Sequence, residues 1–587
     1  MLKYYIESGV KKHTMSIKVL FRKTFFRQLV AVALVACLTH SNKMAYGFTA
    51  DTSISSDTSG QQKFQTNDNL TLTIEEGVTL TRANSKTINT ANSLSGQTVI
   101  IKSGATVETT GGCTNNSAVS LANSTNATIT NSGTISSSCN RGINATNSAT
   151  TGMTITNNAG GIITATDDYA IYGINSSNMT ITNYGTISVS PSSTAIEVGS
   201  DSTIILKEGS LIIGKITSTS TGNKLQFDHG FGRAYFYETT GDFDLEDLSG
   251  NKVVKGSAGS VSLGRQETVD EMLGLRAFNL RSALKRYASA PKSSDDNMVW
   301  GETFGYSSHR SGTDTLLKHD ATGYGMNFIH PVMPKLDLIL SVEQNEMEFP
   351  EEYDVSRTGF LAGVNVSEIS GIGKGNWKLG GFLVAGMGWY DSTREILTNT
   401  TSSGLLDVTA DYNSVEVMTG LNIKHSYQSQ QPLFAWKTPT VNGKIKNRWD
   451  TEIGLTLQGS HTGDYNERAY FFFEERILVQ ESFHLGEQLT STMGNLDFML
   501  GLEYEFRLAL AGKTQTYRIN GTPTDYTDGS FSENSGSGNL GFNYRFGSFA
   551  SSSSSQNLGV AYIRLNSRLS DQSRFTYGGS VGVRLNF

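Results

Sequence analysis

The C-terminal stretch of the chain alternates between apolar and polar residues. From Phe575 to Phe587 the odd positions are Phe, Tyr, Gly, Val, Val, Leu and Phe, and the even positions are Thr, Gly, Ser, Gly, Arg and Asn. A period of two places each set on one face of a β-strand. A length near ten residues with aromatics at both ends is typical of a strand that crosses a bilayer. The predicted lipid-facing positions are Phe575, Tyr577, Gly579, Val581, Val583, Leu585 and Phe587.

Similar alternation fills the whole C-terminal half, where about twelve segments are separated by turns rich in Gly, Ser, Asn and Asp. The clear segments are Val299–Tyr306, Gly323–Val332, Lys335–Val342, Thr358–Val366, Trp377–Tyr390, Ser414–Ile423, Trp449–Leu457, Leu496–Leu508, Leu558–Leu565 and Phe575–Phe587, and two more are expected within Tyr465–Val479 and Asn539–Phe546. Trp377 and Trp389 share one face of a strand, roughly 28 Å apart along a tilted strand, which matches two aromatic girdles around an apolar band. The pattern predicts a 12-stranded antiparallel transmembrane β-barrel over residues 297–587.

A helical pattern precedes the barrel, within a predicted linker region of residues 263–296. Apolar residues recur at helical spacing from Arg265 to Ser289, and Pro291 follows. A helix of this length extends roughly 37 Å, enough to cross a bilayer. Its charged residues, among them Glu267, Asp270, Arg276, Arg281, Lys285 and Arg286, forbid contact with lipid. We expect the helix inside the barrel pore; an amphipathic linker in the periplasm is the alternative.

The N-terminal half is rich in Thr, Ser, Asn and Gly and contains a repeat. The tetrapeptide Thr-Ile-Thr-Asn begins at Thr128, Thr154 and Thr180, and turn glycines recur at steps in the twenties. Such a period, built from short β-branched runs, is typical of a parallel β-solenoid, predicted here as right-handed over residues 48–220. A disordered linker and a leucine-rich repeat are the alternatives. Stacked coils would align Asn131, Asn157 and Asn183 as an amide ladder.

The same repeat relates the two cysteines that follow the N-terminal segment. Cys113 and Cys139 are 26 residues apart, which is one repeat, so they should lie on adjacent coils about 4.8 Å apart. This separation permits a disulfide, although two unpaired thiols in loops would also fit the sequence. After residue 220 the rhythm gives way to an aromatic cluster, and residues 221–262 are predicted to cap the solenoid.

The first 47 residues read as a secretory signal. A basic segment is followed by the apolar run Leu29 to Leu38 and by small residues before Gly47. Translation from Met15 and lipidation of Cys37 remain alternatives. The net charge of -7, with no basic stripe, argues against nucleic acid as a partner.

Taken together, the signal, the Thr/Asn/Gly-rich repeats, the polar helix and the terminal barrel resemble a monomeric autotransporter of the type V secretion class. The first barrel strand, at Val299-Trp300-Gly301, is also similar to that of the family. The resemblance implies an all-β protein of the bacterial outer membrane that is folded by the barrel assembly machinery, which reads the terminal strand. It also implies that the barrel moves its own passenger to the cell surface, with the helix plugging the pore afterwards. In the same family the region equivalent to residues 221–262 helps to start passenger folding, so the resemblance implies that role for the predicted cap.

The passenger sequence gives little support to catalysis. His229 is the only histidine between Met44 and Lys292, so a Ser-His-Asp triad is not expected. Asp167 and Asp168 are adjacent, and adjacent strand residues face opposite ways, which argues against a glycan-cleaving carboxylate pair. No cofactor or metal is expected. The predicted role is a non-catalytic adhesin or self-association module with a host-surface or self ligand; a polysaccharide-cleaving enzyme and a simple surface spacer are the alternatives.

Overall fold

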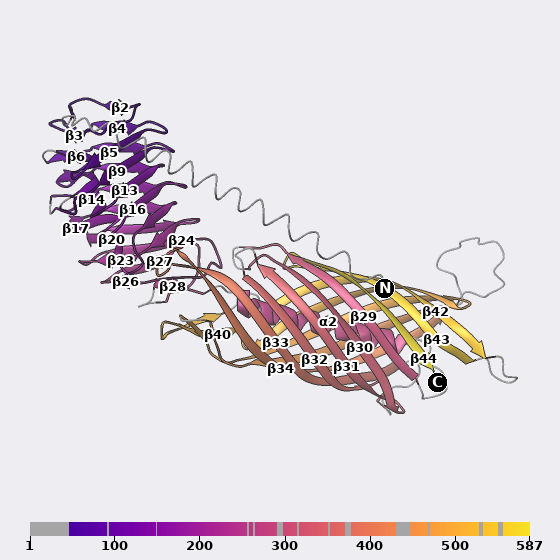
Figure 1. The fold of residues 1–587 in the computed structure, drawn as a ribbon. Coiled ribbons are helices and arrows are strands. Elements are labelled where there is room, and N and C mark those ends of the chain that lie inside the picture. Colours follow the sequence, from indigo (N-terminus) through magenta and orange to yellow (C-terminus); the bar gives the residue numbers. More distant parts are fainter. Residues whose placement is uncertain are drawn as a thin grey trace, which may run out of the picture.

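The structure is a computed structural model that describes residues 46–587, except for 91–92, 115, 148, 255–257, 262–263, 290–297, 314–315, 350–352, 370–376, 430–445, 468–469, 528–531, 550–555 and 587. The described residues form a β-solenoid, one helix and a β-barrel, and the solenoid projects from one mouth of the barrel (Figure 1). The predicted signal segment lies outside the described residues up to residue 45, and its expected cleavage position near Gly47 falls within the first solenoid strand.

Three parallel sheets form the solenoid because each coil contributes one strand to each sheet in turn. The first sheet consists of β1 (Tyr46–Phe48), β3 (Gln62–Phe64), β6 (Ile88–Thr90), β10 (Ser117–Ser120), β14 (Arg141–Asn144), β17 (Ile171–Ser177), β20 (Thr194–Ser200), β23 (Lys215–Ser218) and β26 (Thr239–Thr240). The second consists of β2 (Thr52–Ile54), β4 (Thr71–Ile74), β8 (Thr98–Ile101), β12 (Thr128–Asn131), β15 (Thr154–Asn157), β18 (Thr180–Asn183), β21 (Thr203–Lys207), β24 (Lys224–Asp228) and β27 (Asp244–Asp247). The third consists of β5 (Thr79–Ala83), β9 (Thr106–Thr110), β13 (Thr134–Ser137), β16 (Ile162–Ala165), β19 (Thr186–Ser188) and β22 (Leu211–Ile213), and β7 (Leu94–Ser95) pairs with β11 (Ser124–Thr125).

Identical residues stack on successive coils, as the repeat predicts. Ile129, Ile155 and Ile181 align in register between β12, β15 and β18, and all three are fully buried. In the adjacent column, the Asn131 side-chain amide donates to Asn157 at 2.8 Å, and Asn157 donates to Asn183 at 2.8 Å. The predicted amide ladder is therefore confirmed, and it satisfies polar groups that are removed from water.

The solenoid extends past the predicted boundary at residue 220. β24 pairs with β21 and β27 pairs with β24, so a further coil stacks where residues 221–262 were expected to be only a cap. The repeat was missed here because Leu225 and Phe227 take over the inward positions from isoleucine. Below this coil, β25 (Tyr235–Tyr237) pairs antiparallel with β28 (Ala258–Ser260).

Twelve antiparallel strands close the barrel, because β29 pairs with β44 and β33 pairs with β34. The predicted fold class is confirmed in this respect. In chain order the strands are β29 (Met298–Arg310), β30 (His319–Met333), β31 (Leu336–Phe349), β32 (Tyr353–Val366), β33 (Trp377–Thr398), β34 (Leu405–Ser429), β35 (Lys446–Thr462), β38 (Arg476–Met493), β39 (Leu496–Ala511), β42 (Ser532–Phe549), β43 (Gln556–Ser570) and β44 (Arg574–Asn586).

One predicted barrel strand was misplaced. The window Tyr465–Val479 contains only the start of β38, and its first residues instead form β36 (Tyr465–Glu467) and β37 (Phe471–Phe473). These two strands join β40 (Thr514–Ile519) and β41 (Thr522–Thr527) in a separate sheet of four, called the outer sheet below. The sequence Tyr470-Phe471-Phe472-Phe473 has the aromatic content of a membrane strand, but Phe471 and Phe473 are buried against other protein.

Candidate functional site

The barrel pore holds the helix α2 (Gly264–Ser289) (Figure 1). Apolar side chains of α2 such as Leu273, Leu280 and Tyr287 share one buried cluster with inward-facing barrel residues, Trp300 and Ile339 among them. Tyr287 also donates a hydrogen bond from its hydroxyl to Asp337 of β31 at 2.7 Å. Among the described residues, no helix is both long enough and apolar enough to cross a membrane.

Glu271 of α2 contacts three arginines of the barrel wall. Its carboxylate accepts from Arg310 at 3.1 Å and from Arg507 at 3.3 Å, and it also pairs with Arg574. These arginines lie on β29, β39 and β44, and the Glu271 side chain is only 4% exposed. Removing a buried carboxylate that is paired with several arginines is costly, because the positive charges of the arginines then stay buried without a partner.

Basic residues of α2 make the complementary contacts farther along the pore. Arg276 lies 3.5 Å from Glu416 and 3.9 Å from Glu343. Arg281 pairs with Glu505 at 2.7 Å, and Arg286 pairs with Glu302 at 2.6 Å. Arg281 also lies 3.4 Å from Glu503, Lys285 pairs with Glu503 at 3.3 Å, and Asp270 pairs with Arg476 at 2.8 Å. The charge order of the helix thus matches the charges on the surrounding wall.

Two glycines make room for these arginines. Gly274 lies against the guanidinium of Arg507, and Gly359 of β32 lies against that of Arg276, so a side chain at either position would overlap the arginine. A glycine in the middle of a helix costs roughly 1 kcal/mol relative to alanine. Gly274 therefore gives up helix stability and allows close contact with the pore wall.

Beside the C-terminal half of α2 lies a cavity of about 540 Å³, lined among other residues by Lys285, Lys424 and Glu452. The structure thus places Asp270, Arg276, Arg281, Lys285 and Arg286 inside the pore, while the side chain of Glu267 lies outside the described residues. The residues of the barrel wall that pair with α2 were not predicted from the sequence. They could have been noticed as charged residues at the polar positions of strands whose alternate positions are apolar.

The outer wall of the barrel is apolar. Except for Ile162, Tyr184 and Leu248, every exposed large apolar side chain of the described residues lies on barrel strands. Trp377 and Trp389 are 47% and 46% exposed on β33, with Leu383 and Met387 exposed between them. On β44 the outward-facing side chains are Phe575, Tyr577, Val581, Val583 and Leu585, and Gly579 lies on the same face. Phe587, and Trp436, a further tryptophan of the C-terminal half, lie outside the described residues.

A second interface joins the solenoid to the barrel. One buried apolar cluster, called the junction core below, contains Ala234, Phe236, Val254, Val261, Ile396, Val408, Phe471, Phe473, Tyr517 and Ile519. Its members come from the base of the solenoid, from β33 and β34, and from the outer sheet. Arg233 also pairs with Glu395 of β33 at 2.9 Å. The base of the solenoid is therefore packed against the barrel, in addition to the covalent connection through α2.

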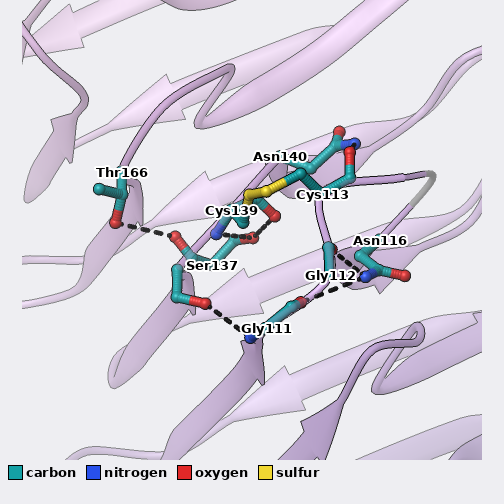
Figure 2. Close-up of a disulfide and its surroundings, with 9 residues drawn as sticks. Gly111, Gly112, Cys113, Asn116, Ser137, Cys139, Asn140 and Thr166 are labelled. Carbon is teal, nitrogen blue, oxygen red and sulfur yellow. Dashed lines mark hydrogen bonds between the residues drawn. A yellow bond between two sulfur atoms is a disulfide. The ribbon is translucent and has the colours of Figure 1, made fainter.

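Cys113 and Cys139 form a disulfide between adjacent coils, with their Cα atoms 5.0 Å apart (Figure 2). The Asn140 side chain donates to the Cys113 carbonyl at 2.9 Å, and the Ser137 hydroxyl donates to the Cys139 carbonyl at 2.7 Å. The bond thus closes one repeat of 26 residues at the edge of the third sheet.

Replacing Cys113 and Cys139 with serine should lower the free energy of unfolding of the solenoid by about 3.5 kcal/mol, because a closed loop of this length restricts the unfolded chain by roughly that amount. Urea unfolding with and without reductant measures the effect. Reductant should shift the midpoint of the wild-type protein and leave that of the double variant unchanged. Equal midpoints for the two proteins without reductant would contradict a stabilising role.

His229 is buried at the base of the solenoid. It is 4% exposed, and its Nε2 lies 3.0 Å from the Tyr237 hydroxyl among the rings of Phe227, Tyr235 and Tyr237. Burial lowers the pKa of His229 to about 4, from an ordinary value of 6.5. The neighbouring Arg233 lowers the pKa further and Asp228 opposes it.

This shift predicts acid sensitivity of the solenoid base. The unfolded state binds a proton at His229 below pH 6.5 and the folded state only below about pH 4, so stability is lost as the pH falls through this window. We expect about 2 kcal/mol less stability at pH 4.5 than at pH 7, measured as a shift of the urea midpoint. His229→Gln should remove that part of the pH dependence and leave the contributions of other groups, such as Asp247. An unchanged slope in the variant would contradict the assignment.

The outer face of the first solenoid sheet carries a cluster of charged and aromatic residues. Asp168 lies 3.9 Å from Arg141, whose guanidinium lies 3.9 Å from the centre of the Tyr172 ring. Tyr172 pairs in register with Glu197 of the next coil. Burial raises the pKa of both Asp168 and Glu197.

Asp167, by contrast, is exposed and is not part of this cluster. The carboxylates that the fold brings together are Asp168 and Glu197, which are 29 residues apart in sequence, rather than the adjacent pair. Burial, and then Glu197, raise the pKa of Tyr169 to about 12. Within the described residues, no group of three His, Cys, Asp or Glu side chains is placed to hold a metal ion.

The chain was compared with known protein families, curated proteins and solved structures. No protein-family model and no curated protein matches the sequence. The translocator domain of the autotransporter NalP from Neisseria meningitidis superposes with a TM-score of 0.38 and 12% identity, covering 55% of this chain and 98% of that one. The β domain of the Bordetella autotransporter BrkA gives 0.32 and 12%, covering 50% and 100%. The transport unit of AIDA-I from Escherichia coli gives 0.33 and 10%, covering 54% and 98%.

The resemblance to autotransporters rests on the elements described above. A parallel solenoid, a helix that fills the pore and a closed barrel of twelve antiparallel strands occur here in one chain and in that order. This chain has the architecture of a monomeric autotransporter.

Proposed function

We propose that the barrel lies in the bacterial outer membrane, carries this chain's own solenoid through its pore, and displays it at the cell surface as a non-catalytic adhesin or self-association module. The path of α2 is the observation that carries the proposal. The helix leads from the solenoid, at one mouth, through the pore toward β29, whose first residue pairs with Asn586 near the end of β44 (Figure 1). A chain that enters its own barrel in this way is the expected end state of transport through the pore.

The solenoid surface supports a binding role. Thr98, Thr128, Thr154 and Thr180 align on successive coils of the second sheet, and Thr71 and Thr203 continue the row. A regular, weakly charged row of hydroxyls on a rigid stack suits repeated weak contacts with a neutral polar partner, such as a glycan or a second copy of the solenoid. The apolar band of the barrel suits outer-membrane lipid, and the alternating β44 suits recognition by the barrel assembly machinery.

External protease on intact cells, followed by electrophoresis with and without heating, tests the proposal. We expect the solenoid to be accessible from outside while a fragment that begins near α2 is protected and shifts its mobility on heating. A solenoid that is shielded in intact cells, or a fragment without a heat shift, would contradict it. Clumping of cells that display the solenoid would favour self-association, and binding to a glycan array would favour adhesion.

Glycan cleavage is the second candidate, because Asp168 and Glu197 both have raised pKa values and share one face of the stack. Glycosidic cleavage requires one carboxyl group as acid and one as base or nucleophile. Turnover of a polysaccharide by the displayed wild-type protein, abolished by both Asp168→Asn and Glu197→Gln, would establish it. Ligand binding without turnover in all three proteins would leave the non-catalytic role.

A further inference from the structure

The outer face of the second solenoid sheet is a regular array of threonines. In the six successive strands β4, β8, β12, β15, β18 and β21, the first and third residues are partly exposed, and the second and fourth are buried. Ten of these twelve outward positions are threonine, and the other two are Ile100 and Ile205. The threonines are Thr71, Thr73, Thr98, Thr128, Thr130, Thr154, Thr156, Thr180, Thr182 and Thr203. These twelve side chains are called the threonine array below.

The array has two columns that stay in register over all six coils. Thr128, Thr154 and Thr180 are direct partners in the first column, and the pairing continues without a shift from β4 to β21. The first sheet, by contrast, shifts register between β17 and β20. Neighbouring strands lie about 4.8 Å apart, and alternate residues of one strand lie about 6.6 Å apart, so the array repeats at these two distances.

The hydroxyls of the array are open to a ligand. In the part of the chain that the structure describes, no side-chain hydrogen bond occupies any of the ten threonine hydroxyls. The third sheet differs, because Ser188 donates to Thr164 at 3.1 Å and Thr81 donates to Glu108 at 2.6 Å. Branching at Cβ restricts the rotamers of threonine, so the backbone fixes where each hydroxyl and methyl group lies. The array is therefore organised before any ligand arrives.

The composition of the array narrows the class of ligand. Its twelve side chains include no ionisable group for a charged ligand and no aromatic ring on which a sugar could stack. The nearest charges are paired with each other, Lys102 with Glu75 at 2.5 Å and Lys207 with Asp228 at 2.7 Å. A flexible chain would lose much conformational entropy in matching many fixed positions, whereas a ligand that is already a lattice has no such cost.

Ice is a neutral polar ligand with these properties. Its oxygen atoms form a rigid lattice, with repeats close to the two distances of the array. Each water molecule can donate to or accept from a threonine hydroxyl, and the methyl groups restrict the orientations of the water beside them. We propose that the threonine array binds ice and thereby attaches the displayed solenoid to ice crystals. This names the ligand of the surface module, and it rests on the proposed function for display outside the cell.

Ice affinity of the purified full chain in detergent tests the proposal. Ice is grown slowly from a dilute solution, and the protein concentration in the ice is compared with that in the remaining liquid for wild type, Thr156→Tyr and Thr130→Tyr. We expect the wild-type protein to be retained in the ice. Retention of each variant should fall about tenfold or more, because a ring that stands above the sheet prevents contact at many positions at once.

The matched control is Thr134→Tyr, because Thr134 follows Thr130 on the same coil but faces outward from the third sheet. It should be retained like wild type, and protease resistance of the solenoid shows that each protein is folded. If Thr156→Tyr is protease-sensitive, Thr130→Tyr provides the same test on another coil.

Exclusion of the wild-type protein from ice, or equal retention of all four proteins, would overturn ice binding. Retention on crystalline cellulose without retention in ice would also overturn it. A purified chain that is retained in ice, together with a solenoid that is shielded from external protease in intact cells, would instead overturn surface display.

Discussion

Replacing Glu271 with alanine is expected to open the pore. The variant leaves Arg310, Arg507 and Arg574 buried without the carboxylate that joins them, and breaking a buried ion pair from one side costs roughly 3 to 5 kcal/mol. A loss of this size raises the population of barrels without a seated helix by about two to four orders of magnitude. Ion conductance of the purified full chain in planar bilayers measures the effect, and uptake of a bulky hydrophilic antibiotic measures it in cells.

The matched control for Glu271→Ala is Glu348→Ala, which removes a carboxylate that is exposed on β31. Its conductance should equal that of wild type, and both variants should keep the heat shift of the barrel. Gly274→Val should also open the pore, because the added side chain meets the Arg507 guanidinium. Wild-type conductance in both pore variants would show that the charges of α2 do not hold the plug.

The barrel and the solenoid could be predicted because each leaves a periodic pattern. The alternation persists in the structure from Phe575 to Leu585 as alternating outward-facing and pore-facing positions of β44. The tetrapeptides at Thr128, Thr154 and Thr180 appear as exact register partners. In both cases a local pattern determines the environment of each residue, and long-range contacts only repeat it.

Contacts between distant segments left no such pattern. Asn399 looks like an ordinary polar turn residue, yet its side-chain amide donates to the carbonyls of Gly214 and Glu238, more than 150 residues away. The partners of Glu271 are likewise spread over three strands. The sequence showed that α2 carries charges that are too costly to bury in lipid. Which residues of the barrel wall face these charges depends on how the barrel closes.

The turn glycines show a subtler limit. Gly104 and Gly160 have φ near +70 to +80°, which favours glycine, and they belong to one column of the stack. Gly133 and Gly185 belong to the next column, where the neighbouring coil passes too close for any side chain. The spacing of the glycines in the sequence could not separate the need for a positive φ from the need for space beside the neighbouring coil, because the two columns are offset by a single residue.

Replacing Asn157 with alanine should destabilise the middle of the solenoid by about 3 kcal/mol. Asn157 is fully buried, accepts from Asn131 and donates to Asn183, Gly161 and Thr186. The alanine variant leaves several of these groups buried with fewer partners, and each such group costs roughly 1 to 3 kcal/mol. Because coils are stabilised mainly by adjacent coils, the loss should be local and should also weaken the coils on either side.

Limited proteolysis of the displayed passenger, with mass analysis of the fragments, measures this local loss. First cleavage in Asn157→Ala should fall in the coils around β15, while wild type should be cleaved first at its ends. Asn158→Ala is the matched control, because the Asn158 side chain is half-buried and bonds to Ser132 at 2.8 Å. Its cleavage pattern should resemble that of wild type. Equal resistance of Asn157→Ala and Asn158→Ala would mean that the isoleucine core, without the amide ladder, is sufficient to hold the coils together.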